Sequence, residues 1–579
     1  METTLRLTLK TQKRFVVRHF LTLLLLLISF PVFGQNAESI RTWKDTTGNF
    51  SIQATFVKMS GDLVVLQRSD QQQLSIPLVK LSANDQQYAR KRHAEIQRYM
   101  SARIVTPQQN LAAIIANAPN NSVIKLTAGI FHLQPQQPHQ QGVLIQNKRG
   151  LIITGSGRDQ TTIKLATPVD VGFLIGSNVE DLKIENLHIQ GTPPLKTNTA
   201  GIGSTSICSE VRNVTLTNLS IDQVAVGIFM ATNKGPVRNV QITNNIVTNT
   251  IGTEAGWGYG IHTRNIGNVE IAHNYIEHAT RHSIYVRESP KHFKLIVQDN
   301  FILNHDLKGK NPRWYCAALN CPDNQGITRI SDNYFINSNA VGIAVMLTAN
   351  DLELVNNQII GEHYIGIWPV TGEIHKALGN SILLHSNPVH PEWCHKISFF
   401  DWPNGKETTS RLESPNARWE QPDFICKLAG DLYIMKDGKL DKITRTTWAF
   451  QSAPNNWSNV KGMCAVENVR GSGLGKLYII TESGFFEVNP ENWEVVEQAG
   501  DWSETRFMAA TNNHVHVLKG STLHSINLMS LEMASSSHDW TAVQWMCAWD
   551  NQLYLYDGQA HYRVNPDTLE KTLISQPSK

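Results

Sequence analysis

Two short segments of the chain place side chains that can transfer protons next to arginines. His262 precedes Arg264 by two positions in the segment GIHTR (260–264), and Tyr285 precedes Arg287 in the same way in SIYVR (283–287). In a β-strand, residues two apart point to the same side, so each ring shares a side with its arginine. This set suits removal of the C5 proton of a uronate. An arginine neutralises the carboxylate, the histidine is the base and the tyrosine gives or takes the second proton.

The product of that chemistry depends on the step after removal of the proton. Loss of the C4 substituent would make the protein a polysaccharide lyase, and return of a proton on the opposite face would make it a C5-epimerase. A glycoside hydrolase needs two carboxylates that flank the bond, and the outward positions of these strands hold none. The alternative is that these side chains only face water, in a non-catalytic surface protein that binds glycans or partner proteins.

Two longer loops enter the same region and carry cations and aromatic rings. We expect them to wall a groove for an acidic polysaccharide, because arginine binds carboxylates through two parallel hydrogen bonds and aromatic faces pack against sugar rings. No carboxylate cluster marks a calcium site, so no cofactor is predicted, with calcium left open. The expected substrate-binding residues are Trp257, Tyr259, Lys308, Lys310, Arg313, Trp314 and Trp368.

A repeat of 24 to 33 residues fills the part of the chain that carries these segments. Each copy alternates apolar residues, as strands do, and then has an asparagine before an apolar pair. A copy this short cannot bury its apolar face alone, so the copies must stack on one another. We therefore predict a right-handed parallel β-helix over residues 105–395, with an asparagine ladder at one corner. The marker asparagines are Asn186, Asn218, Asn245, Asn274, Asn300, Asn333 and Asn357.

Strand alternation predicts which side chains of each coil face outward. The relevant segments are GIFMA (227–231), GIHTR (260–264), SIYVR (283–287), GIAVM (342–346) and GIWPV (366–370), in which the isoleucines point into the coil. Neighbouring coils lie about 4.8 Å apart, so outward residues form columns. One predicted column holds Phe229, His262, Tyr285, Ala344 and Trp368, and the next holds Ala231, Arg264, Arg287 and Met346.

The segment YGIHTRNIGNVEIAHNYIEHATRHSIYVRE (259–288) is similar to the catalytic coils of bacterial mannuronan C5-epimerases, although it lacks the Asp-Pro that precedes the histidine in that family. The resemblance implies that His262 is the base and that Arg287 neutralises the carboxylate. A short amphipathic helix at 111–118, followed by VIKLTAGIFHL, resembles the opening of pectin-lyase-type β-helices. In these proteins a helix caps the first coil.

The first residues have the pattern of a secretory signal peptide. Residues 1–34 combine a basic stretch, a short apolar run from Leu21 to Val32 and small residues near Gly34. The run is shorter than the roughly 20 apolar residues that span a bilayer, so we expect export to the periplasm, cell surface or extracellular space and no membrane span after signal removal. The chain carries a formal net charge of +3, contributed by residues 1–34, so no nucleic-acid partner is expected.

Residues 38–100 form a separate unit. The stretches RTWKDTTGNFSIQATFV and VVLQRSDQQQLSIPLVKLSANDQQYA resemble the SHD1 domain (SLA1 homology domain 1). The resemblance implies a small SH3-like barrel and a peptide or protein partner. From the strand pattern we expect about five strands, followed by a charged helical linker over 89–100. A spacer without a ligand is the alternative.

A second repeat occupies residues 419–579, after a linker at 396–418. Strand patterns recur four times with a period of about forty residues, which indicates a small four-bladed β-propeller, and the block loosely resembles tectonin-like propellers. The fold class is therefore all-β and multidomain. Cys316 and Cys321 either pair or stay free. Each repeat has a tryptophan and, seven residues later, a small residue expected in the core: Trp419, Trp457, Trp502 and Trp540, then Cys426, Cys464, Ala509 and Cys547.

Overall fold

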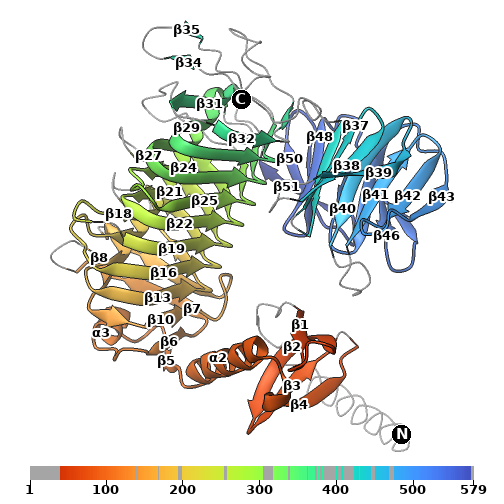
Figure 1. Ribbon diagram of the computed structural model, residues 1–579. Coiled ribbons are helices and arrows are strands. Elements are labelled where there is room, and N and C mark those ends of the chain that lie inside the picture. Colours follow the sequence, from red (N-terminus) through yellow and green to blue (C-terminus); the bar gives the residue numbers. More distant parts are fainter. Residues whose placement is uncertain are drawn as a thin grey trace, which may run out of the picture. The chain divides into compact units, whose positions relative to one another are not determined.

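The computed structural model divides the chain into two compact units, residues 1–100 and 101–579 (Figure 1). The signal segment and the loop residues Lys308, Lys310, Arg313 and Trp314 fall outside the residues that the structure describes. Described are residues 40–68, 70–136, 141–166, 169–192, 199–235, 237–252, 257–303, 317–336, 339–360, 363–371, 374–378, 381–383, 400–401, 406–407, 423–429, 431–444, 450–467 and 475–575.

The first unit is an antiparallel sheet with a helix packed against it. The core surrounds Trp43, whose indole N–H donates to the carbonyl of Ala54 (2.9 Å), and Ala89 of the helix lies in the same core. The sheet therefore has four strands rather than about five, and the helix is part of the fold rather than a linker. The elements are β1 (Arg41–Lys44), β2 (Ser51–Ser60), β3 (Leu63–Gln67), β4 (Gln73–Pro77), the 3-10 helix η1 (Leu78–Lys80) and α2 (Ala83–Met100).

The second unit begins with a parallel β-helix whose first coils are covered by a short helix, α3 (Leu111–Ala116). The side chain of Asn110 caps this helix by accepting from the Ala113 N–H (3.0 Å). The apolar side of α3, including Ile115, joins the core of the coil. The cap predicted from the sequence is confirmed.

Three strand faces make up the β-helix, and we name them A, B and C. Face A holds β8 (Gln141–Ile145), β12 (Val171–Ile175), β15 (Ala200–Ser204), β18 (Val226–Ala231), β21 (Tyr259–Arg264), β24 (His282–Arg287), the first parts of β27 (Ala317–Ser331) and β29 (Asn339–Val355), and β31 (His363–Thr371). Face B holds β5 (Arg103–Val105), β6 (Val123–Leu126), β9 (Lys148–Arg149), β10 (Ile152–Thr154), β13 (Val179–Glu185), β16 (Val211–Thr217), β19 (Val237–Thr243), β22 (Ile266–Ala272), β25 (Lys294–Gln298), the second parts of β27 and β29, and β32 (Ile374–Leu378). Face C holds β7 (Gly129–Leu133), β11 (Thr161–Leu165), β14 (His188–Gln190), β17 (Ser220–Val224), β20 (Ile246–Thr250), β23 (Tyr275–Ala279), β26 (Phe301–Leu303), β28 (Tyr334–Ile336), β30 (Gln358–Ile360) and β33 (Ser381–Leu383).

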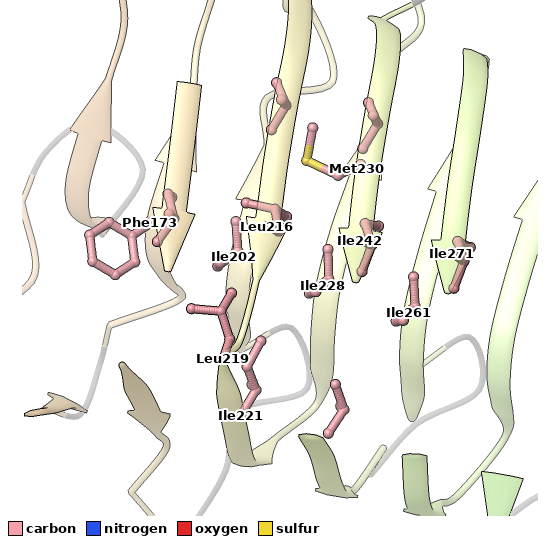
Figure 2. Close-up of a cluster of buried hydrophobic side chains, with 14 of the residues drawn as sticks. Phe173, Ile202, Leu216, Leu219, Ile221, Ile228, Met230, Ile242, Ile261 and Ile271 are labelled. Atoms are coloured by element: carbon pink, nitrogen blue, oxygen red, sulfur yellow. The ribbon is translucent and has the colours of Figure 1, made fainter. Parts of the chain in front are cut away.

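Apolar side chains from the faces fill the coil. Figure 2 shows Ile202, Ile228 and Ile261 on consecutive strands of face A, side by side from left to right, with Ile242 and Ile271 of face B nearby. Each of these side chains is fully buried. The hydrophobic contacts between coils are what hold the stack together, because a single coil cannot bury them.

The asparagine ladder is present, but it is shorter than predicted. From Asn245 to Asn357 each buried side-chain amide donates to the amide oxygen of the next marker asparagine, with four contacts of 2.9 Å. Asn186 and Asn218 are not rungs of it. They have positive φ angles and stand at the corner one residue earlier, in register with Asn244. Leucines at 187 and 219 take the inner position in these first coils.

Four antiparallel four-stranded sheets come next, of the kind that forms propeller blades, as the second repeat predicted. The innermost strand of each sheet carries the small residue of the repeat, and Cys464, Ala509 and Cys547 are buried there. Burial raises the pKa of the Cys426 thiol to about 12, as expected for a core position rather than a reactive site. Before these sheets stands a short strand pair, β34 (Phe400–Asp401) and β35 (Lys406–Glu407). The first sheet holds β36 (Phe424–Leu428), β37 (Asp431–Lys436), β38 (Lys439–Ile443) and β39 (Phe450–Asn456), and the second holds β40 (Val460–Val466), β41 (Lys476–Thr481), β42 (Gly484–Val488) and β43 (Val495–Ala499). The third holds β44 (Thr505–Ala510), β45 (His514–Lys519), β46 (Thr522–Asn527) and β47 (Met533–Ser535), and the fourth holds β48 (Trp545–Trp549), β49 (Gln552–Tyr556), β50 (His561–Val564) and β51 (Lys571–Ser575).

The first and the last of these sheets both contact the β-helix at Asp299. The ammonium of Lys427 lies 3.1 Å from a carboxylate oxygen of Asp299 and 3.6 Å from Asp332 of the next coil. The indole N–H of Trp549 donates to the Asp299 carbonyl (3.1 Å), and Phe301 packs against the same ring. One lysine thus lies beside two stacked carboxylates and offsets part of their mutual repulsion.

Among the residues with described positions, no helix combines the length and the apolar composition needed to cross a lipid bilayer.

Candidate functional site

Strands β18, β21 and β24 place the predicted proton-transfer residues side by side on face A. Cα pairing joins Phe229 to His262 and His262 to Tyr285, and it joins Arg264 to Arg287 in the neighbouring column. Ile261 and Ile284, which directly precede His262 and Tyr285, are fully buried in the coil. The columns expected from strand alternation are therefore confirmed over these three coils.

Further along the coil the predicted column of His262 is right for Trp368 and wrong for Ala344. The strand after β24 is β27, which pairs Tyr285 with Asn320, and the predicted columns left this strand out. The next pairings join Asn320 to Met346 and Met346 to Trp368. Met346 therefore stands in the column of His262 rather than beside the arginines, and Ala344 stands in neither column. The side chain of Trp368 is outside the described part of the structure.

A glycine near the start of β21 allows neighbouring coils to approach closely at the site. A Cβ at Gly260 would lie 2.5 Å from the Ser283 carbonyl oxygen and 2.8 Å from a methyl carbon of Ile276. Only a residue without a side chain allows this close approach at the inner corner. The chain then places Tyr259, the residue before it, beside the outward column, with its ring centroid 5.0 Å from that of His262.

His262 is packed among aromatic rings. Its ring centroid is 4.8 Å from Phe229 and 4.8 Å from Tyr285, and the residue is only 9% exposed. Both ring nitrogens are buried and lack a hydrogen-bond partner in the described structure. Burial, and then the charges of Arg264, Arg287 and Arg281, lower the pKa of His262 from 6.5 to about 3. The imidazole is therefore neutral near pH 7.

The two arginines of the site share one carboxylate, which strand alternation did not predict. Nε of Arg264 donates to Glu288 (2.8 Å), and Nε of Arg287 lies 3.1 Å from the other oxygen of the same carboxylate. Arg287 is also 3.7 Å from Asp323. Glu288 comes directly after β24 and has a positive φ of 56°, so it turns out of the strand at its end. A charged residue just after SIYVR was the only signal for it in the sequence.

Tyr285 and Tyr259 complete the cluster. Tyr285 is half-buried, and burial raises its pKa against the opposing charges of Arg287 and Arg281. The ring of Tyr259 stacks on those of Tyr285 (5.3 Å) and His282 (5.6 Å). Nδ1 of the buried His282 lies 2.9 Å from the backbone of Ala317, which fixes that ring between two coils.

The predicted binding residues are only partly brought together. Tyr259 lies in the cluster, and Trp257 packs against Phe229 with a centroid distance of 6.1 Å. The four residues of the second loop are outside the described ranges. Within those ranges no group of three or more histidine, cysteine or acidic residues is arranged to hold a metal ion. Cys321 is a free thiol buried in the coil, and Cys316 lies outside the described residues.

Comparison with protein families supports the two folds. Residues 171–359 match the right-handed β-helix region. Residues 34–96 match SLA1 homology domain 1 (SHD1). Both expectations from the sequence are thereby confirmed. No curated protein matches the chain at a significant level.

Solved structures give only weak similarities. The extracellular domain of the one component system BT4673 from Bacteroides thetaiotaomicron is 17% identical, with a TM-score of 0.23, and the match covers 30% of this chain and 26% of that one. PorZ, a surface component of the type-IX secretion system of Porphyromonas gingivalis, is 13% identical over 31% and 24% of the two chains, with a TM-score of 0.22. The A-module of the mannuronan C-5 epimerase AlgE4 from Azotobacter vinelandii is 12% identical over 48% and 93%, with a TM-score of 0.25. The chain spans about a quarter of the first two proteins, and similarities at this level say nothing about its activity.

Proposed function

We propose that this chain is an exported β-helix protein that binds an acidic, uronate-containing polysaccharide on face A and acts on it by removing the C5 proton. The observation that carries the proposal is the stacking of Arg264 on Arg287 beside the column that contains His262 and Tyr285. A flat face with a repeat of about 4.8 Å suits an extended polymer. Cations and aromatic rings next to one another suit its carboxylates and its sugar rings.

The reaction would begin with transfer of the C5 proton to His262. The electron pair left on C5 is stabilised by the carboxylate once an arginine neutralises it. In a lyase the pair expels the C4 substituent, and Tyr285, protonated near pH 7, supplies a proton to the leaving oxygen. In an epimerase His262 keeps the proton that it removed, and Tyr285 donates a different proton to C5 from the opposite face. His262 is neutral, as a base must be, but a pKa of about 3 makes it a weak one.

The second candidate is a protein that binds such a polymer without turning it over. The inaccessible nitrogens of His262 favour it, because a base must lie within hydrogen-bond reach of the proton that it takes. The pairing of both arginines with Glu288 also favours it, since it leaves less positive charge for a transition state. Catalysis requires Tyr259 or Tyr285 to move away from the imidazole.

One experiment separates the two candidates. The purified protein is incubated with a panel of polyuronates, while ultraviolet absorbance follows the unsaturated lyase product and solvent deuterium uptake follows exchange at C5. Binding is measured on the same polymers. Turnover that disappears in His262→Ala supports the first candidate, whereas binding without either signal supports the second. Turnover that survives in His262→Ala removes the histidine from the mechanism, and absence of both binding and turnover refutes the proposal.

The terminal units enter the proposal in supporting roles. The basic and apolar pattern of residues 1–34 supports export. We propose that the SHD1 unit binds a peptide or protein partner and that the C-terminal sheets contribute further glycan or protein binding. Pull-down with the separate SHD1 unit, residues 34–100, against exported proteins of the source cell tests the first of these roles.

A further inference from the structure

We propose that Arg281, rather than Arg264 or Arg287, binds the carboxylate of the polymer. This inference rests on the proposed function, because it names the residue that recognises the substrate. Arg281 lies in the corner before β24, where strand alternation gives no information about its direction. The structure places its guanidinium 5.5 Å from the ring centroid of Tyr259.

Arg264 and Arg287 offer a substrate less positive charge than two free arginines would. Arg264 and Arg287 both face Glu288, so the three side chains together carry one positive charge rather than two. These side chains are 35–43% exposed, so an ion pair between them stabilises by only about 0–1 kcal/mol. A substrate carboxylate that displaces Glu288 therefore loses up to about fivefold in affinity.

A substrate carboxylate that binds Arg281 does not lose affinity in this way. Among the described residues, no carboxylate lies within ion-pair distance of its guanidinium, and the residue is partly exposed. Its backbone is held in place, because the Arg281 N–H donates to the carbonyl of Gly258 (2.9 Å). A planar guanidinium over an aromatic ring keeps its donor edge free for a carboxylate.

The position also fits the geometry of the cluster. The ring of Tyr259 contacts Arg281 and stacks on Tyr285, and it lies 5.0 Å from His262. A uronate whose carboxylate is bound at Arg281 would thus lie over Tyr259, with Tyr285 next to the sugar ring. Arg281 is also near enough to both His262 and Tyr285 for its charge to act on them.

Substitution with a matched control tests the inference. Arg281→Gln is compared with Arg238→Gln, because Arg238 on face B is exposed and also lies over an aromatic ring, Phe293, at 5.7 Å. Calorimetry with polygalacturonate and alginate, and with dextran as a neutral polymer, measures binding. Loss of a charge-assisted contact is expected to weaken polyuronate binding about tenfold or more in Arg281→Gln. Arg238→Gln should bind as the wild type does, and Arg281→Lys should restore part of the affinity.

Chemical labelling gives a second measurement that needs no variant. Phenylglyoxal modifies arginines, and peptide mapping by mass spectrometry reports each site. We expect Arg281 to react before Arg264 and Arg287, and we expect polygalacturonate to protect it. Wild-type binding that persists in Arg281→Gln but is lost in Arg287→Gln overturns the inference while the proposed function stands. If the wild type binds no polyuronate, the proposed function fails, and the role of Arg281 fails with it.

Discussion

The buried imidazole of His262 makes the stability of the β-helix depend on pH in a defined way. The pKa of His262 is 6.5 in the unfolded reference and about 3 in the folded chain. The unfolded state therefore binds a proton between these values and the folded state does not. Stability rises with pH wherever the unfolded state binds more protons, so the contribution of His262 is lost as the pH falls from about 6.5 towards 3.

The two pKa values set the size of this effect. One pKa unit corresponds to about 1.4 kcal/mol, so protonation of the unfolded state at His262 costs about 2.5 kcal/mol of stability between pH 7 and pH 4.5. His262→Phe keeps a ring among Phe229, Tyr259 and Tyr285 and removes the titratable group. The variant should lose about 2.5 kcal/mol less than the wild type over the same pH range.

Urea denaturation of both proteins at pH 7 and pH 4.5 measures this difference. Buried histidines elsewhere, such as His516 with a pKa of about 3, are common to both proteins and cancel. His132→Phe is the matched control, because His132 is an exposed residue on face C. Parallel losses for the wild type and His262→Phe would refute the reasoning. They would mean that the imidazole titrates normally and is open to solvent, as a base in contact with substrate would be.

Three further changes have defined outcomes. Glu288→Gln leaves both site arginines without their shared carboxylate, so calorimetry at low salt should show polyuronate affinity raised by about two- to fivefold; weaker binding contradicts this. Asn300→Leu removes an asparagine of the ladder whose side-chain amide hydrogen-bonds to the coils on either side. Urea denaturation should show that the free energy of unfolding falls by about 2–4 kcal/mol, and by less in the corner variant Asn218→Leu. Lys427→Met removes the cation that lies between the stacked carboxylates of Asp299 and Asp332, so the thermal midpoint at pH 7 should fall, with a cost of about 1–3 kcal/mol; an unchanged midpoint contradicts the role of this ion pair.

The sequence was sufficient for the coil wherever strand alternation decides the outcome. Alternation placed Ile228, Ile261 and Ile284 inside and His262 outside, because a strand has only two faces and one of them must be buried. It failed where the repeat is interrupted. The segment around Asn320 does not begin like the other outward strands, so it was left out of the columns. The next segment, GIAVM, was aligned two residues out of register, with Ala344 in the place of Met346, whereas Trp368 was assigned to its correct column.

The wrong prediction that Asn218 belongs to the asparagine ladder has a similar cause. Asn218 and Asn245 look equivalent in the sequence because each precedes apolar residues, yet one stands at a corner with positive φ and the other points into the coil. Asparagine suits both positions, since it tolerates the left-handed region and can also pair with its own kind. Only the backbone conformation distinguishes them. Glu288 was missed for a related reason, because a residue beyond the end of a strand has no face that alternation can assign.

The two coils that carry the site also hold polar groups that a purely structural β-helix would avoid. Besides His262, the hydroxyls of Thr263 and Ser283 are fully buried and have no hydrogen-bond partner in the described structure. A buried polar group without a partner costs roughly 1–3 kcal/mol, and the same inward column is filled by Met230 one coil earlier at no such cost. Phenylalanine at 262 and valine at 263 would fill the same space. Unpartnered buried polar atoms also occur on other strands of the β-helix, at Thr250 and Asn320 for example. Those at His262, Thr263 and Ser283 therefore support the proposed role of the site only in combination with Tyr285, Arg264 and Arg287 on the same two strands.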